Sequence, residues 1–187
     1  MSQAIRQAVL ASGMLREGHF VFAAGDHAVR KLDADYLWEH PEPLAVVLAG
    51  LARADGLPPA DVLLGVPRGG QYLADRLGGP EWLGLPVVQL ERVPGGAKQD
   101  FRFASEADRE LALDAKSPRI YEDIVTTLSS VAGVVRLLEP ERQDIHALAI
   151  WRRGELRPEY ASGVTPHFLV EEPMLSYAPS QCPVCAS

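Results

Sequence analysis

The sequence predicts a single α/β domain with a central, mainly parallel sheet flanked by helices. Short apolar runs typical of buried strands alternate along the chain with segments in which apolar residues recur at helical spacing. A chain of 187 residues is long enough for one domain with its own core. There is no internal repeat, low-complexity segment or linker-like change in composition, so residues 1–187 are expected to form one unit.

The N-terminal third is expected to contain two helices separated by a strand. Apolar residues at helical spacing predict a helix over residues 2–15, which Gly18 would end. Residues 19–22 form a short apolar run typical of a strand. Residues 36–54 return to helical periodicity, and Pro41 indicates the start of that helix because proline is favoured in a first helical turn.

Strands and helices alternate through the rest of the chain. Ligands bind such sheets at the carboxyl ends of the strands, so the turns at 65–70 and 123–130 are the candidate site. Pro118 interrupts the strand that leads to the second turn and leaves Ile120 and Tyr121 as its apolar residues. The predicted elements are strand 61–66, helix 71–77, strand 85–90, a strand ending at 122–123, a helix starting at 131–138, and strands 146–151 and 167–170.

Composition limits the kinds of partner. The formal net charge of −7 disfavours a nucleic-acid-binding surface. No apolar run approaches the ~20 residues that cross a bilayer, and residues 1–10 lack the apolar core of a signal peptide. We therefore expect a cytoplasmic protein that binds small molecules, with no nucleic-acid or membrane partner.

Residues 119–130 carry the strongest functional signal. The adjacent carboxylates Glu122 and Asp123 can accept hydrogen bonds from ribose hydroxyls. Backbone N–H groups and hydroxyls at the helix start that follows can bind a phosphate. Helix capping alone would explain the hydroxyls, but it does not require the acidic pair. The hydroxyl side chains of this turn belong to Thr126, Thr127, Ser129 and Ser130.

The turn at residues 65–70 is a second candidate for binding an anion. Gly69 and Gly70 allow a tight turn and close approach of backbone N–H groups to a phosphate, and Arg68 can add a charged donor. Close packing of a helix on a sheet also requires glycines at such a crossover. Two anion-binding turns at two strand ends suit a ligand with phosphate groups at both ends.

These motifs resemble those of the type I phosphoribosyltransferases, and more narrowly the orotate phosphoribosyltransferase family. Residues 119–130 resemble the phosphoribosyl pyrophosphate motif, in which apolar strand residues precede two acids, Val/Ile, Thr-Thr-Gly and Ser/Thr. Residues 18–27 resemble the N-terminal substrate segment, and 33–41 match its continuation. Residues 65–70 are similar to the pyrophosphate loop, and Cys-Pro-Val-Cys at 182–185 is similar to the Cys-Pro-Leu-Cys tail.

The resemblance implies the type I phosphoribosyltransferase fold and a Mg²⁺-dependent transfer of ribose 5-phosphate from phosphoribosyl pyrophosphate to a pyrimidine, with release of pyrophosphate. It implies a homodimer, with a substrate hood at 1–35, a flexible loop at 94–117 and a cysteine-containing tail at 178–187. The acidic pair would contact ribose, with Mg²⁺ near Asp123, while the turn at 126–130 would hold the 5-phosphate and the turn at 65–70 the pyrophosphate. Four more residues receive candidate roles: Arg92 near the pyrophosphate, His27 near the base or a phosphate, and the catalytic loop cations Lys98 and Arg102.

Several residues depart from the family pattern. Leu128 places a bulky side chain where glycine would allow a positive φ, and Ala24 and Ala28 replace serines. Residues 95–116 lack the family's basic, glycine-containing pattern and are either a solvated surface excursion or a mobile lid. Three functions therefore stay open: a pyrimidine phosphoribosyltransferase, a non-catalytic homologue that binds phosphoribosyl pyrophosphate or a nucleotide, and a transferase for another base.

Cys182 and Cys185 are the only cysteines of the chain. They supply half of a zinc site, form a redox pair, or have a structural or incidental role. Two thiols alone cannot complete a tetrahedral zinc site within one chain, although ligands from a second subunit would complete it. His146 and His167 begin apolar strands and are expected to be partly buried structural residues.

Overall fold

The computed structural model describes residues 2–22, 25–54, 56–138 and 144–185, so the departure at Ala24 lies outside the described residues. Five parallel strands form a central sheet in the order β4-β3-β7-β8-β9, which confirms the predicted fold class. The strands are β3 (Val62–Gly65), β4 (Val87–Val88), β7 (Pro118–Val125), β8 (Ile145–Arg152) and β9 (Val164–Glu171).

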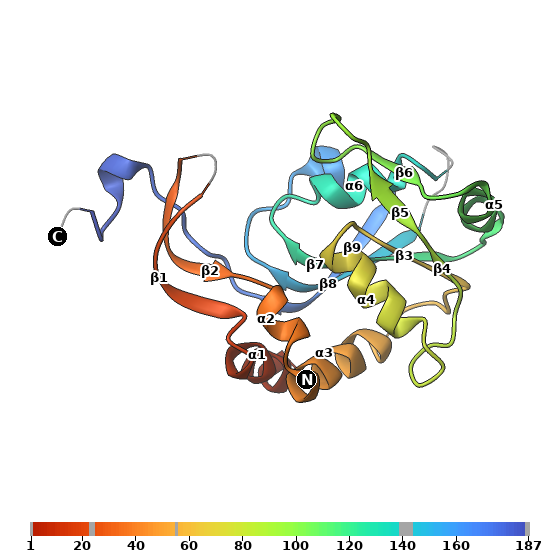
Figure 1. Cartoon of the computed structure of the whole chain (residues 1–187), viewed down its shortest axis with the longest axis horizontal. Helices are drawn as coiled ribbons and strands as arrows, with labels where there is room; N and C mark the ends of the chain where they lie inside the picture. Colours follow the sequence, from red (N-terminus) through yellow and green to blue (C-terminus); the bar gives the residue numbers. More distant parts are fainter. Residues whose placement is uncertain (1, 23–24, 55, 139–143, 186–187) are drawn as a thin grey trace.

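Helices cover both faces of this sheet. Alternate residues of β3 show the division: Leu63 packs in the core beneath α3 and α4, whereas Val62 and Leu64 pack in the core beneath α5 and α6. In Figure 1, α1 and α3 lie along one side of the sheet and α6 lies on the other. The helices are α1 (Ser2–Ala11), α2 (Asp35–Trp38), α3 (Pro41–Ala52), α4 (Gly69–Leu77), α5 (Glu106–Asp114) and α6 (Ser129–Val135), with short 3-10 turns η1 (Pro158–Tyr160) and η2 (Pro179–Gln181).

The first helix is shorter than predicted. It ends at Ala11, and Gly13 then adopts a φ of +76°, which turns the chain into β1 (Leu15–Val21). Gly18 lies within that strand and does not end the helix. The start of α3 at Pro41 agrees with the prediction.

The predicted interruption of β7 at Pro118 was wrong. Pro118 is the first residue of the strand, a position that tolerates the missing amide donor. β3 and β8 pair with the strand on either side as far as Tyr121, and pairing with β8 alone continues it through Glu122 and Asp123 to Val125. The acidic pair therefore lies inside the strand, near its carboxyl end.

The charged segment after β4 forms a hairpin and a helix. β5 (Leu90–Arg92) pairs antiparallel with β6 (Phe101–Phe103), and Ser105 caps α5 by accepting a hydrogen bond from the amide of Asp108 at 3.1 Å. The hairpin packs on α6 at Gly133, where a Cβ atom would lie 2.4 Å from the Gln99 carbonyl oxygen. This contact fixes the position of the hairpin in the structure.

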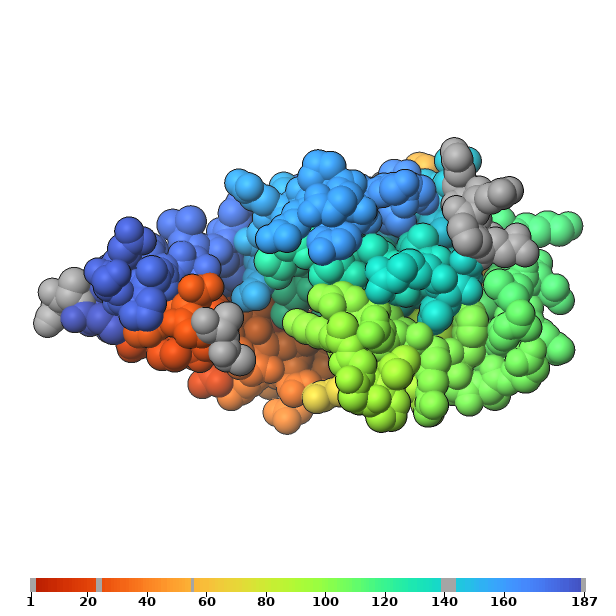
Figure 2. Space-filling view, turned by 90° about the horizontal axis from the view of Figure 1, so that it is seen from above, coloured from red at the N-terminus to blue at the C-terminus, as the bar shows by residue number. Residues whose placement is uncertain are grey.

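A second hairpin projects from the body of the protein. It consists of β1 and β2 (His27–Leu32), and the C-terminal tail lies along it (Figure 1). His27 and Tyr177 exchange two backbone hydrogen bonds, both at 2.8 Å. Figure 2 shows this hairpin and the tail side by side at one end of the elongated molecule.

The two edge strands of the sheet differ in length. β4 has two residues, whereas β9 has eight and contains Pro166.

Among the described residues, no helix combines the length and the apolar character that crossing a bilayer requires.

Candidate functional site

The two predicted anion-binding turns meet at the carboxyl edge of the sheet, where its parallel strands end. β3 and β7 are neighbouring parallel strands, so the turns that follow them emerge side by side. A Cβ atom on Gly69 would lie 2.0 Å from Asp123 Oδ2, and one on Gly70 would lie 2.1 Å from the Tyr121 carbonyl oxygen. The glycines therefore let the start of α4 pack directly against β7, which is the packing role that was also considered for them.

Two adjoining cavities open at this edge. The larger has a volume of about 550 Å³ and the smaller about 280 Å³, and Lys98, Glu122 and Ser130 line both. The larger volume is within the usual range for small-molecule sites. Of the other predicted residues, Arg68, Gly69, Arg92 and Asp123 line the larger cavity, and Thr126, Thr127 and Ser129 line the smaller one.

The two carboxylates of the acidic pair differ in exposure: Glu122 is buried and Asp123 is more accessible. Glu122 is 8% exposed and accepts a hydrogen bond from the Asp123 amide at 3.1 Å. Asp123 Oδ1 accepts one from the Ile124 amide at 2.7 Å. Burial raises the pKa of Glu122 well above its usual range, the nearby Asp123 charge raises it further, and Arg92 opposes both.

Arg92 connects the hairpin to the turn after β3. Its guanidinium donates to the Pro67 carbonyl at 2.7 Å and to the Lys98 carbonyl, and it lies over the Phe101 ring. Arg68 extends into solvent with its guanidinium 3.7 Å from an Asp35 carboxylate oxygen. Together with Lys98, these arginines surround the larger cavity with cations.

Three predicted residues lie outside the two cavities. Arg102 pairs with Glu91 across the exposed face of the hairpin at 2.8 Å. Gly70 faces the backbone of β7. His27 lies at the distal hairpin, where its Nδ1 atom is 2.9 Å from His19 Nε2.

Leu128 adopts the conformation that its side chain was expected to resist. Its φ is +73° and its ψ is 0°, and it lies immediately before α6. The side chain is only 3% exposed and packs in the core beneath that helix. Burial of an apolar side chain offsets the strain, since a left-handed residue costs about 1–2 kcal/mol and full burial of a leucine stabilises by about 1.5–3 kcal/mol.

Replacing Leu128 by glycine is expected to raise the affinity for phosphoribosyl pyrophosphate about fivefold while lowering stability. Leu128 lines the smaller cavity, and glycine adopts its positive φ without strain, which lets the turn approach a phosphate more closely, a gain of about 1 kcal/mol. The lost burial should lower the free energy of unfolding by about 1–3 kcal/mol. Isothermal titration calorimetry and thermal unfolding measure the two effects.

Leu128→Ala is the matched control because it shortens the side chain and keeps the strained φ. A gain in affinity for glycine that alanine does not reproduce would assign the effect to the backbone. Equal dissociation constants in Leu128→Gly and the unaltered protein would contradict the idea that Leu128 weakens the site.

Arg153 is a candidate site residue that sequence reasoning missed. Its Nε atom donates to Thr126 Oγ1 at 3.0 Å, and its guanidinium lies 5.3 Å from the centre of the Phe22 ring. It lines the smaller cavity, and burial lowers its pKa. Its signal was its place directly after β8, the strand beside β7, at the carboxyl edge where ligands bind.

Comparisons with known proteins bear on the fold and on the sequence as a whole. No protein-family model matches the chain. The sequence is 27% identical over 182 residues to an orotate phosphoribosyltransferase of Thermotoga maritima, which covers 97% of this chain and 91% of the relative. The crystal structure of orotate phosphoribosyltransferase from Aeropyrum pernix superimposes with a TM-score of 0.71 at 20% identity, covering 89% of this chain and 93% of that one. Adenine phosphoribosyltransferase from Rhodothermus marinus gives a TM-score of 0.65 at 14% identity, covering 91% and 99%.

The chain thus has the type I phosphoribosyltransferase fold. Within this class, the protein that the chain resembles in sequence is orotate phosphoribosyltransferase, over almost its whole length.

Proposed function

We propose that this protein transfers ribose 5-phosphate from phosphoribosyl pyrophosphate to orotate or a related pyrimidine. In this reaction the bond from the anomeric carbon to the pyrophosphate oxygen breaks, a bond to a ring nitrogen of the base forms, and that nitrogen loses its proton. The observation that carries the proposal is the acidic pair Glu122–Asp123 between two turns that open onto adjoining cavities. A sugar with phosphate groups at both ends matches this order of groups.

Different site residues bind different parts of the ligand. The carboxylates bind the ribose hydroxyls, and the hydroxyls of the turn at 126–130 bind the 5-phosphate. Arg68 and Arg92 face the pyrophosphate, which becomes the leaving group. Lys98 borders both cavities and so lies between the two ends of the sugar phosphate. Fixed cations around the leaving group stabilise the charge that develops as the bond to the anomeric carbon breaks.

Magnesium fits the donor set of the larger cavity. Glu122 and Asp123 offer hard carboxylate oxygens, and Mg²⁺ is commonly bound by one or two carboxylates together with substrate phosphates and water. When bound, the ion would neutralise the pyrophosphate. The residues described above provide the binding and orientation of the sugar.

The distal hairpin is the proposed substrate hood. Phe22, at the end of β1, lies against the Arg153 guanidinium beside a further cavity of about 350 Å³. An aromatic ring next to a cation suits a flat base that carries a carboxylate, as orotate does. We also propose a homodimer, in which the loop at 94–117 of each subunit lies over the site of its own chain, where Lys98 lines both cavities.

The first test is turnover of orotate, followed by its ultraviolet absorbance with phosphoribosyl pyrophosphate and Mg²⁺. Loss of orotate with release of pyrophosphate supports the proposal. Turnover of adenine and not orotate would overturn the choice of base, which matters because adenine phosphoribosyltransferases share the fold. Binding of phosphoribosyl pyrophosphate without turnover of any base would instead favour a non-catalytic binding protein.

Lys98→Ala should reduce kcat far more than Arg102→Ala, although both residues are cations of the same hairpin. Lys98 borders both cavities, whereas Arg102 is paired with Glu91 on the exposed face. We expect a loss of about 100-fold for Lys98, corresponding to about 2.7 kcal/mol, and less than about threefold for Arg102. Steady-state kinetics with both variants measures the difference. Similar losses would show that the hairpin rearranges during turnover and brings Arg102 to the substrate.

A further inference from the structure

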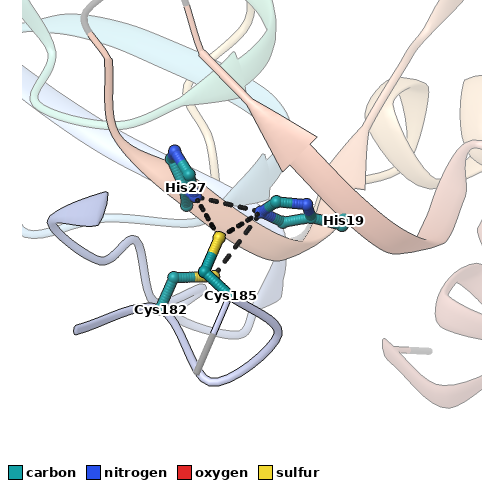
Figure 3. A group of neighbouring side chains, drawn as sticks. All are labelled: His19, His27, Cys182 and Cys185. Carbon is teal, nitrogen blue, oxygen red and sulfur yellow. Dashed lines mark hydrogen bonds between the residues drawn. The ribbon is translucent and has the colours of Figure 1, made fainter. Parts of the chain in front are cut away.

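The structure brings both cysteines of the chain together with two histidines of the distal hairpin. His19 lies in β1, His27 begins β2, and Cys182 and Cys185 lie in the turn that follows η2 (Figure 3). The potential ligand atoms of all four side chains lie within 4.8 Å of one another. Among the described residues, no other group of three or more His, Cys, Asp or Glu side chains converges in this way.

Three of the ligand distances are close to the edges of a tetrahedral zinc site. With Zn–N bonds of about 2.0–2.1 Å and Zn–S bonds of about 2.3 Å, nitrogen and sulfur ligands should be about 3.5 Å apart. Three of the four nitrogen–sulfur pairs are 3.6 Å (His19 Nε2 to Cys182 Sγ), 3.5 Å (His19 Nε2 to Cys185 Sγ) and 3.2 Å (His27 Nδ1 to Cys185 Sγ) apart, and the fourth lies within 4.8 Å. The two nitrogens are 2.9 Å apart, somewhat closer than the two ligands of one ion would be.

Hydrogen bonds alone do not account for this arrangement. His19 Nε2 lies close to His27 Nδ1 and to both sulfur atoms, yet a ring nitrogen carries at most one proton and can donate to only one of the three. A divalent cation would accept a lone pair from every one of the four atoms. Two thiolates would also balance its charge, while the histidines bind as neutral rings.

The distal hairpin has little other means of support. No residue of β1 is buried, and in β2 only Ala28 and Leu32 are. Small units without a core of their own are commonly stabilised by a metal ion or disulfides. The turn from Cys182 to Cys185 is itself preformed, since the Cys185 amide donates to the Cys182 carbonyl at 3.1 Å.

We propose that His19, His27, Cys182 and Cys185 form a structural zinc site that fastens the C-terminal tail to the distal hairpin. Two nitrogen and two sulfur ligands in a tetrahedral arrangement favour zinc, and four protein ligands leave no open position for a substrate. The site is separate from the catalytic cavities and does not depend on the proposed reaction. Sequence reasoning left three roles open for the cysteines, namely half of a zinc site, a redox pair, or a structural or incidental pair, because it did not bring the two histidines to them.

Metal analysis of untagged, reduced protein tests the proposal directly. We expect about one zinc per chain, retained against a moderate chelator, and nearly none in Cys185→Ser or His19→Asn. His146→Asn is the matched control, since His146 and His167 form a similar ring pair with a nitrogen–nitrogen distance of 2.9 Å but no thiol nearby. That variant should keep its zinc.

Cobalt substitution and hydrogen exchange keep the proposal testable if the variants fold poorly. Unaltered protein reloaded with Co²⁺ should show thiolate-to-cobalt charge-transfer absorption and a tetrahedral ligand-field spectrum. Stripping the metal with a strong chelator should speed amide exchange in residues 15–32 and 174–185 and leave the sheet unchanged. Protein that is isolated without metal and with a Cys182–Cys185 disulfide would overturn the proposal, as would zinc that persists in both ligand variants.

Discussion

Asp123→Asn is expected to lower kcat/KM for phosphoribosyl pyrophosphate by at least about 100-fold while the protein stays folded. The asparagine oxygen can still accept the hydrogen bond from the Ile124 amide, so the local backbone should be preserved. The lost charge removes the stronger acceptor for the ribose hydroxyls and one of two proposed oxygen ligands for Mg²⁺. A 100-fold loss corresponds to about 2.7 kcal/mol of transition-state stabilisation.

Steady-state kinetics and thermal unfolding separate the catalytic effect from a structural one. Asp75→Asn is the control. The Asp75 carboxylate also accepts hydrogen bonds, in its case from the side chains of Gln71 and Gln89, but it lies on α4 and lines neither cavity. It should keep nearly full activity. An Asp123→Asn variant with unaltered kinetics would remove the carboxylate from the proposed mechanism.

Gly70→Ala is expected to cost about 3 kcal/mol of stability or more. The new Cβ atom would lie 2.1 Å from the Tyr121 carbonyl oxygen and 3.0 Å from the Glu122 Cα atom, both of which belong to the backbone of β7. Neither atom can rotate away, so α4 would have to move off the sheet, and overpacking of this kind costs about 1–3 kcal/mol or more. Thermal denaturation should show a fall in Tm of about 10 °C.

Gly84→Ala supplies a comparison in which strain occurs without overlap. Gly84 has a φ of +63°, and the nearest atom to its added Cβ would be Pro80 Cα at 4.0 Å. We expect a cost of about 1 kcal/mol there, from the left-handed backbone alone. If the two variants lose equal stability, close packing of α4 on β7 is not what requires Gly70.

The fold was predictable where one physical signal dominated a segment. The apolar run at 61–66 and the proline at position 41 predicted β3 and the start of α3 because burial and helix entry are determined locally. β7 was harder, since Pro118 predicts an interruption and only pairing with β8 explains why the strand continues past Tyr121. The β5–β6 hairpin has few apolar residues, and its docking on Gly133 depends on a contact that is distant in sequence.

Much the same distinction applies to the site. The order of residue types along 119–130 and 65–70 was enough to predict two turns at the carboxyl edge of the sheet, because neighbouring parallel strands end at the same edge. Lys98 and Arg102 could not be told apart, as their different surroundings arise from the hairpin fold. The cluster of histidines and cysteines joins residues 163 positions apart, from His19 to Cys182, and no spacing within either segment indicates the other.

The two edge strands of the sheet restrict how two copies of this protein can associate. β4 offers an incoming strand only two residues, and in β9 Pro166 lacks the amide that a regular ladder would use. Neither edge therefore provides a long, uninterrupted template for continuing the sheet into another molecule. A dimer is therefore expected to form through helices, loops or side-chain surfaces, and short or proline-containing edge strands are also features that disfavour edge-to-edge aggregation.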